Sequence, residues 1–169
     1  MAIFLKDGET AVREHLLLYA NTGSKESPVW SIIGRHVESS DMEYDYSKED
    51  KKDIVGNTYT EMKKPIVTQT FDSLPVIGGD PVVEKIYENT RKQDISAMTQ
   101  YDLLLVHRYA GADSAYEAER YDASTILCTR QGGDGGGFLT YGLDATFGGE
   151  HTLGTAAISG GSVTFTPET

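Results

Sequence analysis

Residues 30–94 read WSIIGRHVESSDMEYDYSKEDKKDIVGNTYTEMKKPIVTQTFDSLPVIGGDPVVEKIYENTRKQD, and the order of elements in this stretch decides the fold. A strand-like segment at residues 30–39 is followed by a charged run that carries acidic residues and tyrosines. Two β-prone segments and one helical pattern complete the stretch. No catalytic motif interrupts this order, which favours a β-framework that carries assembly contacts.

The charged run between residues 38 and 53 holds seven acidic residues and three lysines. Neither a helical nor a strand period survives in it. The run therefore predicts a long loop at about residues 40–53, or the tip of an extended hairpin. Loops longer than about 12–15 residues in compact domains are usually functional or disordered. We expect this one to be a mobile surface element or a contact that becomes ordered late.

Segments rich in β-branched and aromatic residues predict the strands of the framework. Residues 101–109 (YDLLLVHRY) form the strongest of them, because they are short, apolar and closed by polar residues at both ends. The other expected strands are residues 15–20, 30–39, 54–60, 65–71, 115–130, 138–141, 145–147 and 163–166.

One helix is expected after Asp80. Aspartate is a favourable N-cap, and Pro81 suits the first helical position because its missing N–H has no partner there in any case. The apolar residues that recur at helical spacing, and so predict one buried face, are Val82, Val83, Ile86 and Tyr87.

Length and composition indicate one domain over residues 1–169, mainly β with one flanking α-helix, in a β-sandwich or barrel. Residues 131–169 form a glycine-rich C-terminal region that holds eleven of the 18 glycines and no Lys or Arg. No apolar run approaches the ~20 residues that a membrane span needs. The N-terminal sequence has charges where a signal peptide needs an apolar core, so export by that route is not expected.

The formal net charge of −11 restricts the partners. Nucleic-acid affinity depends on Lys and Arg that neutralise phosphates, and here 26 acidic residues face 15 basic ones. A specific nucleic-acid binder is therefore not expected. The single cysteine, Cys128, has no intramolecular partner for a disulfide, which agrees with a reducing compartment.

The glycine run at residues 132–137 (GGDGGG) invites comparison with a phosphate-binding loop. Such a loop needs Lys-Ser/Thr after its last glycine, or a following helix, and Phe138-Leu-Thr-Tyr follows instead. A calcium-binding glycine–aspartate repeat is the other option, but there is one incomplete copy. A flexible turn between strands is the preferred interpretation.

The remaining polar candidates do not form a motif. His15, His36, His107 and His151 are not at metal-ligand spacing, although two could converge in the fold. Cys128 lies in an alternating run and is expected to be a small buried hydrophobe. The carboxylates of residues 41–53 could bind calcium or form an acid/base pair, but they alternate with lysines and lack EF-hand spacing.

We therefore predict no catalytic, cofactor-binding or metal-binding residue, and no enzymatic activity. No nucleophile-elbow G-x-S-x-G motif is present. Trp30, the only tryptophan, is expected to anchor the core, with an interface anchor as the alternative.

Three segments and one helix, in this order, carry a family resemblance: Glu38-Ser-Ser-Asp-Met-Glu-Tyr-Asp-Tyr-Ser, Val55-Gly-Asn-Thr-Tyr-Thr, Gln69-Thr-Phe-Asp and the helix after Asp80. The pattern resembles the major tail tube proteins of long-tailed bacteriophages over roughly the middle half of the chain. The inner tube proteins of contractile tails, tailocins and type VI secretion systems share that family's fold and are the related alternative.

The resemblance implies a structural virion protein whose subunits form hexameric rings, stacked into a hollow tail tube through which DNA passes without specific binding. It places residues 40–53 as the loop that reaches a neighbouring ring. It also implies tape-measure, terminator and initiator proteins as partners, no membrane, no cofactor, and assembly in the host cytoplasm. From a different class, the ten tyrosines and glycine-rich loops leave a carbohydrate- or peptide-binding β-sandwich open. A hydrolase that uses converged carboxylates is the third hypothesis.

Overall fold

The computed structural model describes residues 4–112 and 114–169, and it confirms a mainly β fold, with 51% of residues in strands. The strands are β1 (Leu16–Asn21), β2 (Trp30–Ile32), β3 (Met42–Asp45), β4 (Glu49–Lys52), β5 (Thr58–Glu61), β6 (Ile66–Pro75), β7 (Tyr101–Ala112), β8 (Ala115–Gly132), β9 (Thr140–Phe147), β10 (His151–Ser159) and β11 (Ser162–Pro167). The helices are α1 (Pro81–Lys92) and α2 (Ile95–Met98), and η1 (Arg13–His15) is one 3₁₀ turn.

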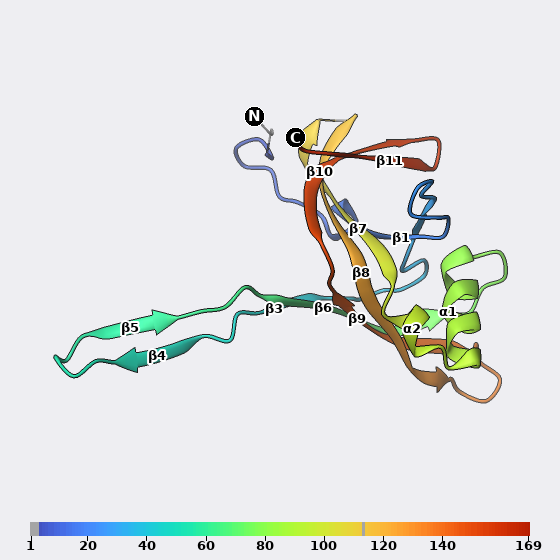
Figure 1. Ribbon diagram of the computed structural model, residues 1–169. Coiled ribbons are helices and arrows are strands. Elements are labelled where there is room, and N and C mark those ends of the chain that lie inside the picture. The colour runs from blue at the N-terminus through green and yellow to red at the C-terminus, as the bar shows by residue number, and fades with distance from the viewer. Residues whose placement is uncertain (1–3, 113) are drawn as a thin grey trace.

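Nine strands form one antiparallel sheet in the order β2-β1-β7-β8-β9-β6-β3, and β10 and β11 branch from it at β8 (Figure 1). The 18-residue strand β8 is shared between two parts of this sheet. Its first part pairs with β7 on one edge and with β10 on the other, whereas its last eight residues pair with β9. The pair β4–β5 stands apart as a separate two-stranded sheet.

Strand β7 is buried on both faces, which explains its continuous apolar sequence. Leu103 and Leu105 belong to a core cluster that also holds the apolar face of α1. Leu104 and Val106 point to the opposite face, into a second cluster that contains Trp30. The β10–β11 hairpin contributes side chains that pack against this second cluster, and Trp30 is a core anchor, as the sequence predicted.

A buried polar network joins β1, β7 and β8. The Arg120 guanidinium donates two hydrogen bonds to the carboxylate of Asp102, at 2.9 and 2.7 Å. Asn21 donates to the same carboxylate at 3.2 Å, and Lys85 of α1 donates to the carbonyl oxygen of Asn21 at 3.0 Å. The buried charge of Asp102 is therefore paired and hydrogen-bonded, as burial of a carboxylate requires.

The expectation of a loop at residues 40–53 is wrong, and the alternative of an extended hairpin is the one observed. Met42–Asp45 forms β3, which pairs with β6 in the main sheet. Glu49–Lys52 forms β4, which pairs with β5 across a turn at residues 53–57. No strand period was visible because β4 and β5 lie outside the protein body, where polar side chains are solvated on both faces.

Other strand boundaries also differ from the prediction. Strand β2 ends at Ile32, because Gly34 and His36 adopt positive φ angles of 102° and 60° that interrupt an extended backbone. The strand expected at residues 54–60 begins only at Thr58. The segments expected at 138–141 and 145–147 belong to one strand, β9, and β10 was not predicted.

Helix α1 forms as the sequence predicted, with Pro81 in its first turn and with Val82, Val83 and Ile86 buried, but Tyr87, which was expected on the buried face, is exposed. The buried Asp80 is its N-cap, and its Oδ1 accepts hydrogen bonds from the backbone N–H groups of Val82 and Val83, at 3.0 and 3.4 Å.

We expect Asp80→Ala to lower the free energy of unfolding by about 1–2 kcal/mol, because the N–H groups of Val82 and Val83 lose their acceptor. Asp80→Asn retains a side-chain oxygen and should lose much less. Urea denaturation followed by circular dichroism measures both, and equal midpoints for the two variants would contradict this role.

Candidate assembly surface

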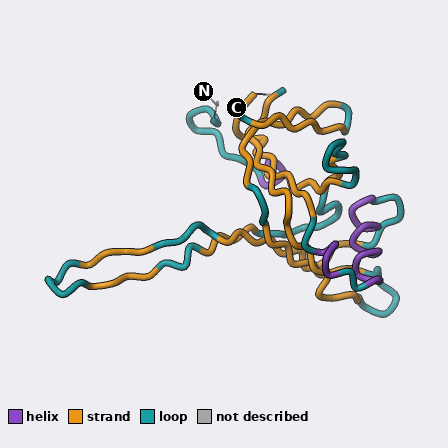
Figure 2. The backbone as a smooth tube through the Cα atoms, in the orientation of Figure 1, coloured by secondary structure: helices purple, strands orange, loops and turns teal. Residues whose placement is uncertain are grey.

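The most exposed part of the molecule is the arm, which we define as residues 46–63. Figures 1 and 2 show it as a long hairpin that extends away from the body of the protein. Its strands β4 and β5 pair only with each other among the described residues. The arm begins where the N–H of Lys63 donates to the carbonyl oxygen of Tyr46, at 2.9 Å, and every residue of β4 and β5 is exposed.

The tip of the arm is a turn organised by Asp53. Its Oδ1 accepts the backbone N–H groups of Val55 and Asn57, at 3.0 and 2.9 Å, and these hydrogen bonds, with that of Asn57 foremost, lower the pKa of the Asp53 carboxyl. Gly56 has a φ of +88°, which glycine adopts without strain. The side chains of Ile54 and Val55 are 105% and 75% exposed. The turn thus displays two aliphatic side chains that no described residue covers.

The charges of the arm are arranged as pairs along its length. Lys51 forms ion pairs with Glu49 and Glu61, and Lys48 forms one with Asp50. These acidic residues therefore do not converge into a carboxylate site of the kind that the sequence left open. Among residues 4–112 and 114–169, no group of three His, Cys, Asp or Glu side chains is placed to hold a metal ion.

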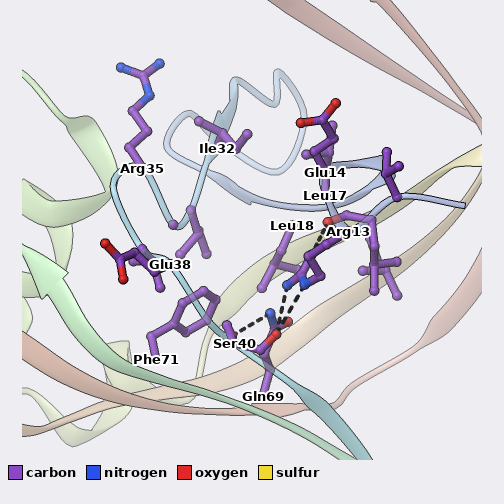
Figure 3. A pocket seen from close by; sticks show the side chains of 16 residues that line it. Arg13, Glu14, Leu17, Leu18, Ile32, Arg35, Glu38, Ser40, Gln69 and Phe71 are labelled. Atoms are coloured by element: carbon purple, nitrogen blue, oxygen red, sulfur yellow. Dashed lines mark hydrogen bonds between the residues drawn. The ribbon is translucent and has the colours of Figure 1, made fainter.

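A groove of about 400 Å³ lies at the base of the arm, between β1, the segment at residues 33–40 and β6. Its apolar lining includes Leu18, Phe71 and Leu105, as Figure 3 shows in part. The Arg13 guanidinium is held at the groove by the carbonyl oxygens of Ser40 and Leu16, at 2.9 and 2.8 Å. Its lining residues are Val12, Arg13, Glu14, Leu16, Leu17, Leu18, Ile32, Ile33, Gly34, Arg35, Val37, Glu38, Ser40, Gln69, Phe71 and Leu105.

Gln69 is the one buried polar side chain of this groove, and it is only 3% exposed. Its Nε2 donates to the hydroxyl of Ser40 at 3.0 Å, whereas its Oε1 has no hydrogen-bond partner within the described part of the chain. Buried polar atoms are rarely left without a partner, because their desolvation then costs free energy.

Two of the four histidines converge, as the sequence analysis allowed. His107 of β7 and His151 of β10 both approach the carboxylate of Glu119 on β8, with each Nε2 at 2.8 Å from a carboxylate oxygen. Because an ionised carboxylate only accepts, both histidines donate through Nε2. When neutral, the His107 ring then accepts the hydroxyl hydrogen of Tyr109 at Nδ1, where the two atoms are 2.8 Å apart.

This cluster is structural in its geometry. The hydrogen bond from His107 is the largest influence on the pKa of the Glu119 carboxyl and lowers it; burial opposes this, and the hydrogen bond from His151 lowers the pKa further. The ring of His151 also stacks on Tyr121 with centroids 4.6 Å apart, and burial raises the pKa of that tyrosine. The Nε2 atoms of both imidazoles are therefore hydrogen-bonded to Glu119, and the cluster links β7, β8 and β10.

The other sequence candidates occupy ordinary structural positions. Residues 132–137 begin at the end of β8 and lead into β9 through a turn in which the Gly137 N–H donates to the Asp134 carbonyl oxygen at 2.9 Å. Strand β9 follows this turn, so the phosphate-loop alternative lacks its helix. Cys128 is half-buried against the core, and burial raises the pKa of its thiol. His15 and His36 are not part of the Glu119 cluster. No helix of the described residues is both long and apolar enough to cross a membrane.

Sequence reasoning missed the two main features of this surface. Ile54 and Val55 were assigned to a strand, because β-branched residues favour strands wherever they occur. The groove draws its residues from β1, β2, β6, β7 and two connections, and no local pattern predicts that convergence. The Glu119 cluster had only one signal, the unusually polar sequence of the strand expected at residues 115–130.

No family model and no curated protein sequence matches this chain significantly. Its fold is similar to that of the sheath/tube terminator of PVC, an extracellular contractile injection system, in the extended state. The two structures align with a TM-score of 0.56 and 7% sequence identity, and the alignment covers 88% of this chain and 99% of the terminator chain. A chain of the PVC sheath–tube complex in the extended state aligns with a TM-score of 0.52 and 8% identity, over 88% and 94%. The anti-feeding prophage cap, which terminates the AFP tube, aligns with a TM-score of 0.51 and 11% sequence identity, over 91% of this chain and 97% of that chain. At these identities the likeness is one of fold, and it spans most of each chain.

The Glu119 cluster predicts how stability depends on pH. Because the folded state lowers the pKa of this carboxyl below its ordinary value of 4.5, its contribution is present above pH 4.5 and is lost as the pH falls through the folded value. Glu119→Gln should lower the free energy of unfolding at pH 7 by about 1–2 kcal/mol and flatten its decrease in acid. Urea unfolding between pH 3 and pH 7 measures the free energy of unfolding of each variant. Glu117→Gln, two residues away on the same strand, is the control, and equal behaviour of the two variants would refute the assignment.

Proposed function

We propose that this protein is a structural subunit of a tail-type tube, and specifically a major tube subunit that self-assembles into stacked hexameric rings. The observation that carries the proposal is the arm, a two-stranded hairpin that ends in exposed aliphatic side chains and makes no strand pairs with the described residues of the protein body. An isolated two-stranded hairpin is at best marginally stable in water. An arm of this kind gains stability when another molecule covers it.

The fold supports the same proposal. Its likeness to PVC and AFP tube-associated chains extends over 88–91% of this chain. An arm that projects from one side and binds elsewhere on the next copy makes a heterologous contact, which generates rings or extended stacks. The formal charge of −11 suits a lumen through which DNA passes without being bound. Tape-measure, initiator and terminator proteins belong to this proposal as partners, and a virion or virion-like particle as its location.

A second candidate is a tube terminator or cap. Two of the similar structures are described as a sheath/tube terminator and as a tube-terminating cap, and this specific likeness favours it. The two functions differ in how far assembly continues. A major subunit stacks into tubes of indefinite length, whereas a terminator stops at one ring and binds the end of a tube.

Removal of the arm tests the proposal. The backbone N–H of Lys63 already donates to the carbonyl oxygen of Tyr46. Replacing residues 47–62 with Asn-Gly should therefore close a tight two-residue hairpin. We expect the shortened protein to fold, since β4 and β5 contribute nothing to the two core clusters, but to lose stacking into tubes. Electron microscopy of concentrated protein and light scattering after gel filtration measure assembly, and circular dichroism measures folding.

A matched control shortens a different exposed hairpin. Replacing residues 134–138 with a two-residue turn removes Phe138, which is 88% exposed, but leaves the arm intact, and it should leave assembly unchanged. If the full chain stays monomeric at every concentration and with tube components added, the proposed function is wrong. Rings that never stack would favour the terminator.

A further inference from the structure

We propose that the groove at the base of the arm receives the arm tip of a second copy of this chain. This inference rests on the proposed function and names the surface through which stacking occurs. The groove and the tip stand at opposite ends of the same hairpin, since Ser40 and Gln69 line the groove beside β3 and β6, whereas Ile54 and Val55 form the far turn (Figures 1 and 3). A tip therefore does not reach the groove of its own chain while the arm is extended.

The two surfaces match in their apolar parts. The tip presents Ile54, which is fully exposed, and Val55, which is largely exposed, and the groove offers a lining of aliphatic side chains and Phe71. The two side chains are neighbours in the turn, and contiguous exposed apolar patches mark protein–protein contact sites. Burial of both side chains removes apolar surface from water on each partner.

The charged groups around the two surfaces also match. Lys52, next to the tip, makes no ion pair or hydrogen bond through its side chain within the described residues. Glu14 and Glu38 line the groove and are likewise unpaired among the described residues, while Arg35 offers a partner for Asp53 (Figure 3). Opposite charges at the rim of an apolar contact determine its orientation.

The geometry makes the contact head-to-tail. Residues 41–53 span about 40 Å at the ~3.3 Å rise of each strand residue. A copy whose groove holds the preceding tip keeps its own tip free for the next copy, so the contact repeats without closing on a pair. Successive copies are then offset by about 40 Å along the arm.

Cysteine cross-linking tests this pairing in the full chain. In a Cys128→Ser background, one preparation carries Ile54→Cys and another carries Val12→Cys, a half-exposed position in the groove lining. When the two are mixed and mildly oxidised, we expect a dimer on a non-reducing gel that contains one chain of each. A chain with both cysteines should give a ladder of higher oligomers. The control pairs Ile54→Cys with Phe138→Cys, which is more exposed but lies outside the groove, and it should cross-link at least tenfold less.

The outcomes separate this inference from the proposed function. If tubes or rings form but Ile54→Cys couples to Phe138→Cys as well as to Val12→Cys, or only to itself, the groove is not the receptor and the inference is wrong, while the proposed function stands. If neither the full chain nor any variant assembles, both fail. Loss of tubes in Ile54→Asp together with their loss in Leu17→Asp, when both variants remain folded, would support the pairing. Tubes that persist in Ile54→Asp would overturn it.

Discussion

The junction at Ser124 determines how the sheet divides. The hydroxyl of this fully buried serine accepts the N–H of Gly148 at 3.1 Å, and Asp122 Oδ1 accepts the N–H of Glu150 at 2.7 Å. Between them Gly149 has a φ of +79°, and a Cβ there would lie 2.2 Å from Asp122 Oδ1. The extended backbone is therefore interrupted between β9 and β10 at this point, while β8 continues alongside both strands.

The interruption between β9 and β10 lets these two strands pair with different partners. Strand β9 pairs with β6, and β6 pairs with β3, so the base of the arm is attached to the rest of the sheet through β9. Strand β10 instead pairs with β11, whose side chains pack against the second core cluster around Trp30. One strand, β8, thus supports both the arm and the cover of the second cluster. A rigid base of this kind is what a projecting element needs if its tip is to reach a fixed position on a neighbour.

The sequence predicted those elements whose determinants are local. Helix α1 depends on Asp80, Pro81 and an apolar face within one short segment, and β7 is recognisable because burial on both faces leaves it continuously apolar. Strands β3 and β4 depend on partners 21–27 and 6–12 residues away and carry no period, so they were assigned to a loop. The Glu119 cluster needs the register of β7, β8 and β10 together, which no single segment contains.

The polar groups inside the protein and the apolar groups on its surface are satisfied to different degrees. Inside the protein, Asp102 is paired with Arg120, Glu119 accepts two histidine donors, and the Asp80 carboxylate caps a helix. An active site usually needs the opposite, a titratable group whose protonation is adjusted but whose reactive atom stays open to substrate. Among the described residues, Gln69 Oε1 and His15 Nδ1 are buried without a hydrogen-bond partner, and the aliphatic tip of the arm and the apolar groove are uncovered. The tip and the groove offer apolar surface that gains free energy when another molecule covers it, which is the property of a contact surface.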